Sequence, residues 1–426
     1  MTDREYLFSL EQIGIKLGLE QIRALLELLG HPEVSFPSIV VAGTNGKGSV
    51  TAMVERGLRA AGYRTGRYTS PHLTHIEERI AIDGAPITSA AFDALAARVR
   101  TAGAALPFPP SFFEATTALA LEAFRDAAID VAILEVGLGG RLDATNAVTP
   151  VMSVITAIDL DHQIYLGNTL EAIAAEKAGI IKEHVPVVVG ANPAVALDVI
   201  RATASALNAP FTYAPSGVTA SGTFASGLTT VQMTTPLQPW PAMTLGLRGR
   251  HQIENAVTAT RVLEEVSDRG LFHVSPDHIQ TALERVQWPA RLEMRNWTTG
   301  PTDRTVHVLI DGAHNPAGAR ALAEYLSEAY GHPLPIIVAA MSDKDISGIL
   351  NALARSASTF VCTRAGSARA AAPAAIAHTA GASAPDVPVL IAETPADALA
   401  LAAPLGDPII VAGSLYLAGE IRELLS

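Results

Sequence analysis

Residues 40–54 read VVAGTNGKGSVTAMV, in which an apolar run meets a glycine-rich turn and then a helical pattern. A strand, a glycine loop and a helix in this order aim backbone amides and a helix N-terminus at a phosphate group. The usual phosphate loop reads G-x-x-x-x-G-K-[ST], whereas here Gly48 separates Lys47 from Ser49. The stretch therefore predicts an α/β fold with a variant phosphate loop.

The side chains inside the turn favour a bound nucleotide over a plain βα turn, which is the alternative. Glycines at 43, 46 and 48 let the backbone approach an oxygen-rich ligand closely. Lys47 is placed to put an ammonium on the β- and γ-phosphates. Ser49 is placed to offer a hydroxyl to Mg²⁺ at the start of the helix.

The composition excludes several classes of protein. The chain has 426 residues, enough for two or three domains, and a formal net charge of −12, which argues against general binding to nucleic acid or membrane surfaces. It has no apolar run of about 18 residues, so no membrane span is expected. The first residues, MTDREYLFSLEQIG, carry charges where a secretory signal needs an apolar core. With a single cysteine, Cys362, no disulfide framework is possible, and we expect a cytoplasmic protein.

Strand-like and helical patterns alternate along most of the chain. This alternation predicts a mostly parallel sheet covered by helices. Residues 215–247 are rich in Thr, Ser, Gly and Pro and predict hairpins, with a poorly ordered insertion as the alternative. A second alternation begins near Val306. We place a domain boundary in the aperiodic stretch 286–305, giving domains 1–290 and 291–426.

Two further strands of the first half end in polar residues. The stretch ILEVGLGGRLDATN (133–146) puts Glu135 near the end of an apolar strand, where a Walker-B-like metal carboxylate fits. An edge residue followed by a flexible loop is the alternative. The stretch TAIDLDHQIYLG (156–167) puts Asp159, Asp161 and His162 past another strand end. Because Mg²⁺ prefers oxygen, these residues alone favour a turn histidine bonded to the backbone.

Other polar residues have ordinary structural explanations. Lys177, in EKAGIIK, is expected on a solvated helix face. A capping box with Ser111 would explain Glu114. In LIDGAHNPAGARAL (309–322), Asn315 could cap the helix that follows, which leaves Asp311 and His314 without a structural explanation.

Taken together, these motifs resemble one family. GTNGKGS, TSPHL with ERI, FFEATT, LEVGLGGRLDATN, DH…LG, EKAGI, WPARLE and DGAHNP occur in this order, and the likeness runs on to VAGSLYLAGEI. They resemble the folylpolyglutamate synthase and dihydrofolate synthase family, the folate branch of the Mur ligase superfamily. The resemblance implies a P-loop ATPase domain with a parallel-type sheet and a small β-rich insertion, followed by a smaller Rossmann-like α/β domain that ligates glutamate.

The resemblance also implies roles for individual residues. It assigns ATP phosphates to the loop Gly43, Thr44, Asn45, Gly46, Lys47, Gly48 and Ser49. It assigns two Mg²⁺ ions to Ser49, Glu135, His162 and a carbamylated Lys177, against the residue-based interpretations of His162 and Lys177. It implies that Asn255 contacts adenine, Asp311 the ribose, and Arg291 and His314 the phosphates. Lys47, Lys177, Arg291 and His314 are the implied catalytic residues.

The implied reaction is ATP-dependent amide formation between L-glutamate and dihydropteroate, a folate, or both, through an acyl phosphate. The family also implies a monomer. A Mur ligase of cell-wall synthesis, a P-loop kinase and a nucleotide-binding module without catalysis are the alternatives. GLGGRLDATN and TSPHL count against the first, and Asp311 with His314 in a second α/β half count against the kinase. Retention of Lys47 and Glu135 counts against a module without catalysis.

Overall fold

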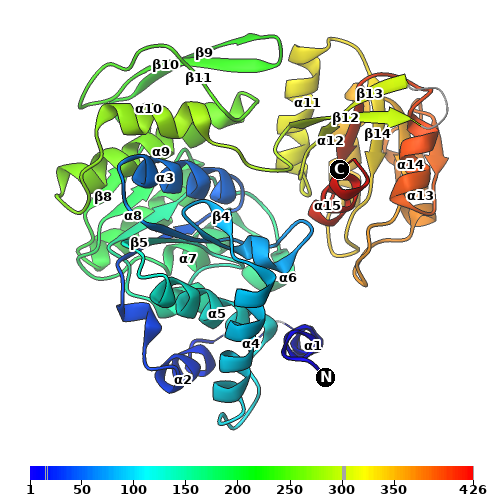
Figure 1. Cartoon of the computed structure of the whole chain (residues 1–426). Helices are drawn as coiled ribbons and strands as arrows, with labels where there is room; N and C mark the ends of the chain where they lie inside the picture. Colours follow the sequence, from blue (N-terminus) through cyan, green and yellow to red (C-terminus); the bar gives the residue numbers. More distant parts are fainter. Residues whose placement is uncertain (15, 17, 300–303, 426) are drawn as a thin grey trace. The chain divides into compact units, whose positions relative to one another are not determined.

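The computed structural model describes residues 1–14, 16, 18–299 and 304–425 (Figure 1). Contacts group the chain into two compact units. Unit 1 holds residues 1–220, 233–243 and 254–286, and unit 2 holds residues 221–232, 244–253 and 287–426. The predicted boundary after residue 290 stays a prediction. No helix within the described residues is both long enough and apolar enough to cross a membrane.

Unit 1 is built on an eight-stranded sheet in the order β4-β3-β2-β5-β1-β6-β7-β8. Strands β2, β5, β1, β6, β7 and β8 run parallel, which confirms the parallel-type sheet, and β3 and β4 extend one end antiparallel. The strands are β1 (Ser38–Ala42), β2 (Thr65–Tyr68), β3 (Ile80–Ile82), β4 (Ala85–Pro86), β5 (Val131–Glu135), β6 (Met152–Ile155), β7 (Val187–Val189) and β8 (Phe211–Tyr213).

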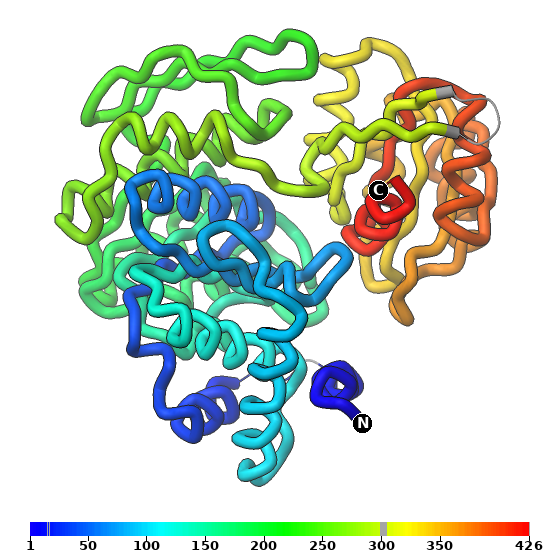
Figure 2. Tube along the Cα trace, viewed as in Figure 1, coloured from blue at the N-terminus to red at the C-terminus, as the bar shows by residue number. Residues whose placement is uncertain are grey.

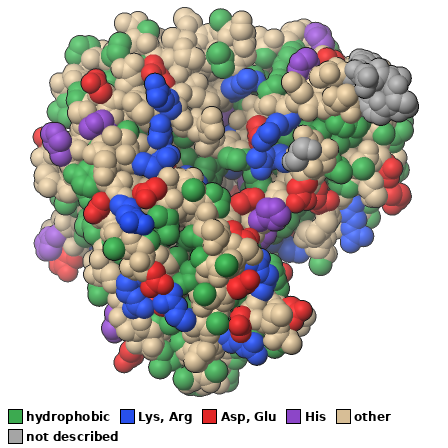
Figure 3. Space-filling model, in the orientation of Figure 1, with side chains coloured by type: hydrophobic (Ala, Val, Ile, Leu, Met, Phe, Trp, Pro, Cys, Tyr) green, Lys and Arg blue, Asp and Glu red, His purple; other side chains and the backbone are tan. Residues whose placement is uncertain are grey.

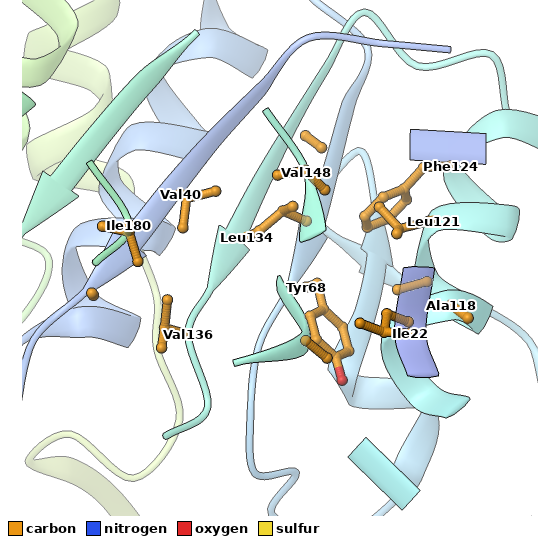
Figure 4. Packing of buried hydrophobic residues seen from close by; sticks show 14 of the residues in the cluster. Ile22, Val40, Tyr68, Ala118, Leu121, Phe124, Leu134, Val136, Val148 and Ile180 are labelled. Atoms are coloured by element: carbon orange, nitrogen blue, oxygen red, sulfur yellow. The ribbon is translucent and has the colours of Figure 1, made fainter. Parts of the chain in front are cut away.

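Helices cover both faces of this sheet. On one face α3 (Lys47–Ala60) packs against α10 (Pro276–Arg285) and α9 (His251–Asp268), which belongs to unit 1 from Glu254 onward. The other face buries the cluster in Figure 4, where Val40 and Leu134 of the sheet lie with Leu121 and Phe124 of a helix. The helices of this second layer are α2 (Glu20–Leu28), α5 (Phe112–Asp126), α7 (Leu170–Ala178) and α8 (Ala194–Ala206), with α1 (Asp3–Ser9), α4 (Ser89–Gly103) and α6 (Gln163–Leu166) also in unit 1. Because β1 and β5 are buried on both faces, their sequences are apolar runs rather than alternating patterns.

The predicted hairpins form a three-stranded sheet, so the alternative of a poorly ordered insertion is wrong. Its strands are β9 (Thr219–Ala225), β10 (Leu228–Thr234) and β11 (Met243–Thr244). Figure 2 shows this segment in green, where it follows β8 and precedes α9 along the chain. Tyr325 of unit 2 donates a hydrogen bond to the carbonyl of Gly227 at the hairpin tip, at 3.3 Å. The Phe224 ring packs edge-on against Tyr325, with centroids 5.5 Å apart.

Unit 2 is built on a six-stranded sheet in the order β12-β13-β17-β14-β15-β16. The strands are β12 (Glu293–Thr299), β13 (Arg304–Ile310), β14 (Leu334–Val338), β15 (Ala357–Cys362), β16 (Val389–Ile391) and β17 (Ile409–Ala412), and the helices are α11 (Pro316–Ala329), α12 (Ile346–Leu353), α13 (Pro373–Ser383), α14 (Pro395–Ala402) and α15 (Leu415–Leu424). The second alternation is thereby confirmed.

Strand β12 corrects the expectation that residues 286–305 are aperiodic. It pairs antiparallel with β13 at the edge of the sheet. Its side chains at Met294, Arg295 and Asn296 are half-buried or exposed. An edge strand with so little burial carries no clear alternation of apolar and polar residues, and for that reason its residues showed no strand pattern.

Candidate active site

The glycine-rich loop lies at the point of the unit 1 sheet where ligands bind in open α/β folds. Strand β1 has β5 and β2 on one side and β6, β7 and β8 on the other, so the strand order reverses at β1. Ligands bind beyond the carboxyl ends of the strands at such a position. Residues 43–46 leave β1 there, and α3 begins at Lys47. The N-terminus of this 14-residue helix favours an anion in front of it.

Two of the loop's three glycines, Gly43 and Gly46, are required by close neighbours. Gly43 has φ 150° and Gly46 has φ 87°. A Cβ on Gly43 would lie 1.9 Å from Oγ1 of Thr156, and a Cβ on Gly46 would lie 2.4 Å from Oδ1 of Asn255. The Thr156 hydroxyl in turn donates to the Asn45 carbonyl at 2.7 Å. The side chain of Thr156, just after β6, thus bonds the loop, and Asn255 of α9 lies close against it.

The first amides of the loop bond within the protein. The N–H groups of Thr44 and Asn45 both donate to the carbonyl of Ala157, at 2.7 and 3.2 Å. This segment thus bonds to the chain that follows β6, beyond the ends of both strands. The first turn of α3 is then the part of the loop that can present backbone donors to a phosphate.

Two lysines reach the loop from different directions. Lys47 Nζ donates to the Thr44 carbonyl at 3.1 Å, and Lys177 Nζ donates to the Gly43 carbonyl at 2.7 Å. Lys177 is only 4% exposed, so the interpretation of a solvated helix face is wrong. The helix α7 packs that side chain beneath the loop, which the spacing of one helix could not reveal.

Burial, together with the nearby positive charge of Lys47, lowers the pKa of Lys177 from 10.5 to about 7. The carboxylates of Asp161 and Asp143 oppose this shift. At neutral pH a far larger share of the Lys177 amines is therefore unprotonated than for an ordinary lysine, for which the share is roughly 1 in 3,000. An unprotonated amine is the form that can react with CO₂.

Glu135 is the last residue of an interior strand, and therefore the edge-residue alternative is wrong. Strand β5 lies between β2 and β1, with Glu135 beside Val41. The carboxylate is 6% exposed and accepts a hydrogen bond from the Ser70 amide at 3.4 Å. Ser49, in the first turn of α3, is 3% exposed. A buried hydroxyl and a buried carboxylate are the oxygen donors that Mg²⁺ prefers, so these two residues fit the implied ion.

The loop after β5 is ordered by one carboxylate. Asp143 accepts hydrogen bonds from the amides of Gly137 and Leu138, at 3.1 and 2.8 Å, and from the amide and hydroxyl of Thr145, at 3.0 and 2.6 Å. Burial raises the pKa of Asp143, and these hydrogen bonds oppose that effect. Arg141, in the same loop, points to Glu176, at 2.8 Å.

The loop after β6 holds His162 in a left-handed conformation, with φ 51°. Its amide donates to Oδ1 of Asp161 at 2.8 Å, and its Nε2 lies 3.9 Å from Oδ2 of the same carboxylate. The expected turn is present, with a carboxylate beside the ring. Across the described residues, no three His, Cys, Asp or Glu side chains are grouped as a ready-made metal site. The implied set has only Glu135 and His162 from those types.

Unit 2 brings three predicted residues together where β12 and β13 meet the start of α11. Asp311 is 7% exposed and accepts the amides of Leu292 and Ala313, both at 2.9 Å. Arg291 Nη1 donates to the Ala290 carbonyl at 2.9 Å. His314 Nδ1 lies 2.8 Å from the Gly312 carbonyl. A Cβ on Gly312 would lie 2.4 Å from Arg291 Nη1, so the guanidinium lies over this turn.

Comparison with known proteins agrees with both units. Residues 41–263 match the family model for the Mur ligase middle domain, and residues 296–424 match that for the dihydrofolate synthetase C-terminal domain. The chain is 34% identical over 425 residues to a probable dihydrofolate synthetase of Schizosaccharomyces pombe, covering 96% of this chain and 99% of the relative. It is 32% identical to the dihydrofolate synthase/folylpolyglutamate synthase of Bacillus subtilis, covering 99% and 98%. The chain belongs to the folylpolyglutamate synthase and dihydrofolate synthase family.

A solved structure of the same family has the same fold. The folylpolyglutamate synthase of Mycobacterium tuberculosis, complexed with ADP and AMPPCP, matches with a TM-score of 0.90 at 36% identity, covering 100% of this chain and 99% of that chain. The α/β fold class expected from the resemblance is thereby confirmed.

Local motifs of this folylpolyglutamate synthase family member fold as predicted. Ser111 and Glu114 form a capping box at the start of α5, and Asn315 caps α11 through the Gly318 amide at 2.8 Å. Asn255 lies against Gly46 in unit 1, and its adenine contact stays a prediction.

Sequence reasoning did not reveal some of the charged neighbours of the predicted site residues. His251, at the start of α9, is near enough to Asp311 and Arg291 for their charges to act on its pKa, which burial lowers. The stretch RHQIEN, which contains His251, carried no signal of this, because Arg291 and Asp311 lie about 40 and 60 positions away along the chain. Asp161 was seen at a strand end, but only the structure shows it close enough to act on Lys177.

Proposed function

We propose that this protein is an ATP-dependent ligase that joins L-glutamate to dihydropteroate, to a folate, or to both. The observation that carries the proposal is the pair of lysines at the glycine loop, with Lys177 buried against Gly43. The similarity over nearly the full length to relatives named for these two activities supports it.

In this proposal the loop from Gly43 to Ser49 binds the ATP phosphates, with Lys47 on the transferred group. Arg291 and His314 of unit 2 bind phosphate oxygens, and Asp311 binds the ribose. Asn255 contacts the adenine. The two carboxylate oxygens of Asp311 already accept backbone amides, which fixes its orientation for a further donor. We assign ATP binding to residues 1–290 and glutamate ligation to residues 291–426.

The carboxylate of the pteroate or folate attacks the γ-phosphoryl group, the bond to the β-phosphate oxygen breaks, and ADP leaves. The glutamate amine then attacks the acyl phosphate, losing a proton, and inorganic phosphate departs. Phosphoryl transfer of this kind depends on positioning and charge neutralisation more than on covalent help from the protein. Lys47 neutralises the phosphate charge. The loop that Asp143 orders directly follows β5 and so helps to hold the end of that strand in place.

Ser49, Glu135, His162 and Lys177 would hold Mg²⁺, the last after carbamylation. Bound Mg²⁺ supplies charge neutralisation of the nucleotide phosphates. Lys177 fits this role because its lowered pKa favours the neutral amine. Neutral lysine and CO₂ give a carbamic acid, which loses a proton and becomes an anionic oxygen ligand. We further propose a monomeric enzyme of the cytoplasm, as the resemblance and the lone, buried Cys362 suggest.

A substrate panel tests the function. Dihydropteroate, dihydrofolate and tetrahydrofolate are each incubated with ATP, Mg²⁺ and L-glutamate, and ADP and the amide product are measured. ADP formation that requires both glutamate and a pteroate or folate compound is expected. ADP formation with glutamate omitted, or without an amide product, would contradict the proposal.

A further inference from the structure

Asn192 lies beyond the end of β7 and bonds the segment that leads from β6 to Asp161 and His162. Its Oδ1 accepts the Ile158 amide at 2.8 Å. Its Nδ2 donates to the carbonyls of Thr156 and Gly190, both at 3.0 Å. The carbonyl oxygen and both N–H bonds of this amide side chain are thus used, in the orientation that its partners dictate.

The same segment is bonded from its other side by the phosphate loop. Ala157 accepts the amides of Thr44 and Asn45. The Thr44 hydroxyl donates to the Asp159 carbonyl at 3.0 Å and accepts the Asp159 amide at 3.1 Å. Asn192 therefore bonds residues 156 and 158, and the loop bonds residues 157 and 159.

The hydrogen bonds of Asn192 take the place of backbone pairing between β6 and β7 beyond the point where that pairing ends. The last rung between β6 and β7 is the bond from the Gly190 amide to the Ile155 carbonyl, at 2.8 Å. Beyond this bond, the Thr156 carbonyl and the Ile158 amide are bonded on the β7 side by the Asn192 side chain instead of by backbone. Without Asn192 the Ile158 amide and two carbonyls would need water or a new path for the chain.

We propose that Asn192 is a positioning residue: it holds the segment 156–162 against the phosphate loop and so sets where Asp161 and His162 stand relative to bound nucleotide. The inference rests on the proposed function only in taking His162 as a ligand of the nucleotide's metal ion. In this inference Asn192 acts through that segment rather than by contact with substrate. Replacing Asn192 should reduce the gain in nucleotide affinity that the metal ion confers and leave the metal-free affinity of the phosphate loop for nucleotide nearly unchanged.

The test compares ADP binding with and without a metal ion. Dissociation constants of ADP are measured calorimetrically for full-length protein in EDTA and in Mn²⁺, which serves as the metal probe. For Asn192→Leu we expect the gain in affinity that Mn²⁺ confers to fall about tenfold, with less than a twofold change in EDTA. Asn192→Ala, which removes the same three hydrogen bonds with a smaller side chain, is measured alongside in case the leucine variant does not fold. Asn351→Leu, at an exposed position of α12, is the matched control and should change neither constant.

A second measurement separates positioning from simple stabilisation. In a His162→Ala background, Asn192→Ala should reduce the Mn²⁺ gain by less than a further twofold, because its effect passes through the segment that carries His162. A lower melting temperature with an unchanged Mn²⁺ gain, an additive loss in the double variant, or a wild-type protein without any Mn²⁺ gain would overturn the inference. If wild-type protein forms no glutamate-dependent ADP but keeps the Asn192-dependent Mn²⁺ gain, the proposed function fails and the inference stands.

Discussion

Lys177→Met removes the buried amine, keeps a side chain of similar length, and should change how the stability of the protein depends on pH. Burial lowers the pKa of Lys177 from 10.5 to about 7 in the folded protein. Between these values the unfolded chain holds a proton on this lysine that the folded protein does not. Wild-type stability therefore rises with pH through this window, and the penalty for burying the ammonium is fully present below pH 7.

The size of this change in stability follows from the difference between the pKa values of Lys177 in the folded and unfolded protein. Each pKa unit corresponds to about 1.4 kcal/mol. From pH 6 to pH 9 this lysine should add about 2–3 kcal/mol to the free energy of unfolding of wild-type protein, because the first part of that range lies below the folded pKa. Lys177→Met lacks this contribution. Relative to wild type, the variant should be more stable at pH 6 than at pH 9 by the same amount.

Guanidinium chloride unfolding at pH 6 and pH 9 measures the difference, in buffers purged of CO₂ so that no carbamate forms. The hydrogen bond to the Gly43 carbonyl is lost at both pH values, and its effect of about 1 kcal/mol cancels in the comparison. Lys16→Met, at an exposed lysine, is the control and should follow wild type. Equal pH dependence of Lys177→Met and wild type would show that the amine titrates normally and refute the reasoning.

Three further substitutions test the loop and its carboxylate. Lys47→Ala should abolish turnover and leave the circular dichroism spectrum unchanged, because the side chain stands at the first residue of α3 and donates to the nearby Thr44 carbonyl. Full activity would contradict the nucleotide assignment. Glu135→Gln should lower Mg²⁺-dependent ATP turnover at least about tenfold, which corresponds to roughly 1.4 kcal/mol. The control Glu27→Gln, at an exposed glutamate, should not lower it. An unchanged rate and Mg²⁺ requirement would show that Glu135 is a packing residue and not a metal ligand. Gly43→Ala should lower the free energy of unfolding by about 3 kcal/mol or more, since its Cβ would lie 1.9 Å from Thr156 Oγ1. The control Gly62→Ala, at φ 91° with open space around it, should lower the free energy of unfolding by about 1 kcal/mol. Equal losses from the two variants would contradict the crowding argument.

Short-range features of this protein could be predicted from its sequence. The loop from Gly43 to Ser49 follows its strand and opens its helix as expected, because strand, turn and cap are set by residues within a few positions of one another. The capping box of Ser111 and Glu114 is equally local. Ordered motifs along the whole chain also sufficed to indicate the family.

The tertiary structure alone decided what surrounds those motifs. Residue spacing assigned Lys177 to solvent, but α7 packs it under a loop 134 positions earlier in the chain, and burial there changes its protonation. Asn192 carried no motif, and its partners at 156 and 158 meet it only because β6 and β7 pair side by side. Hydrogen bonding and desolvation depend on which atoms approach within a few ångströms, and for these residues the approaching atoms come from strands and helices that only the folded sheet brings together.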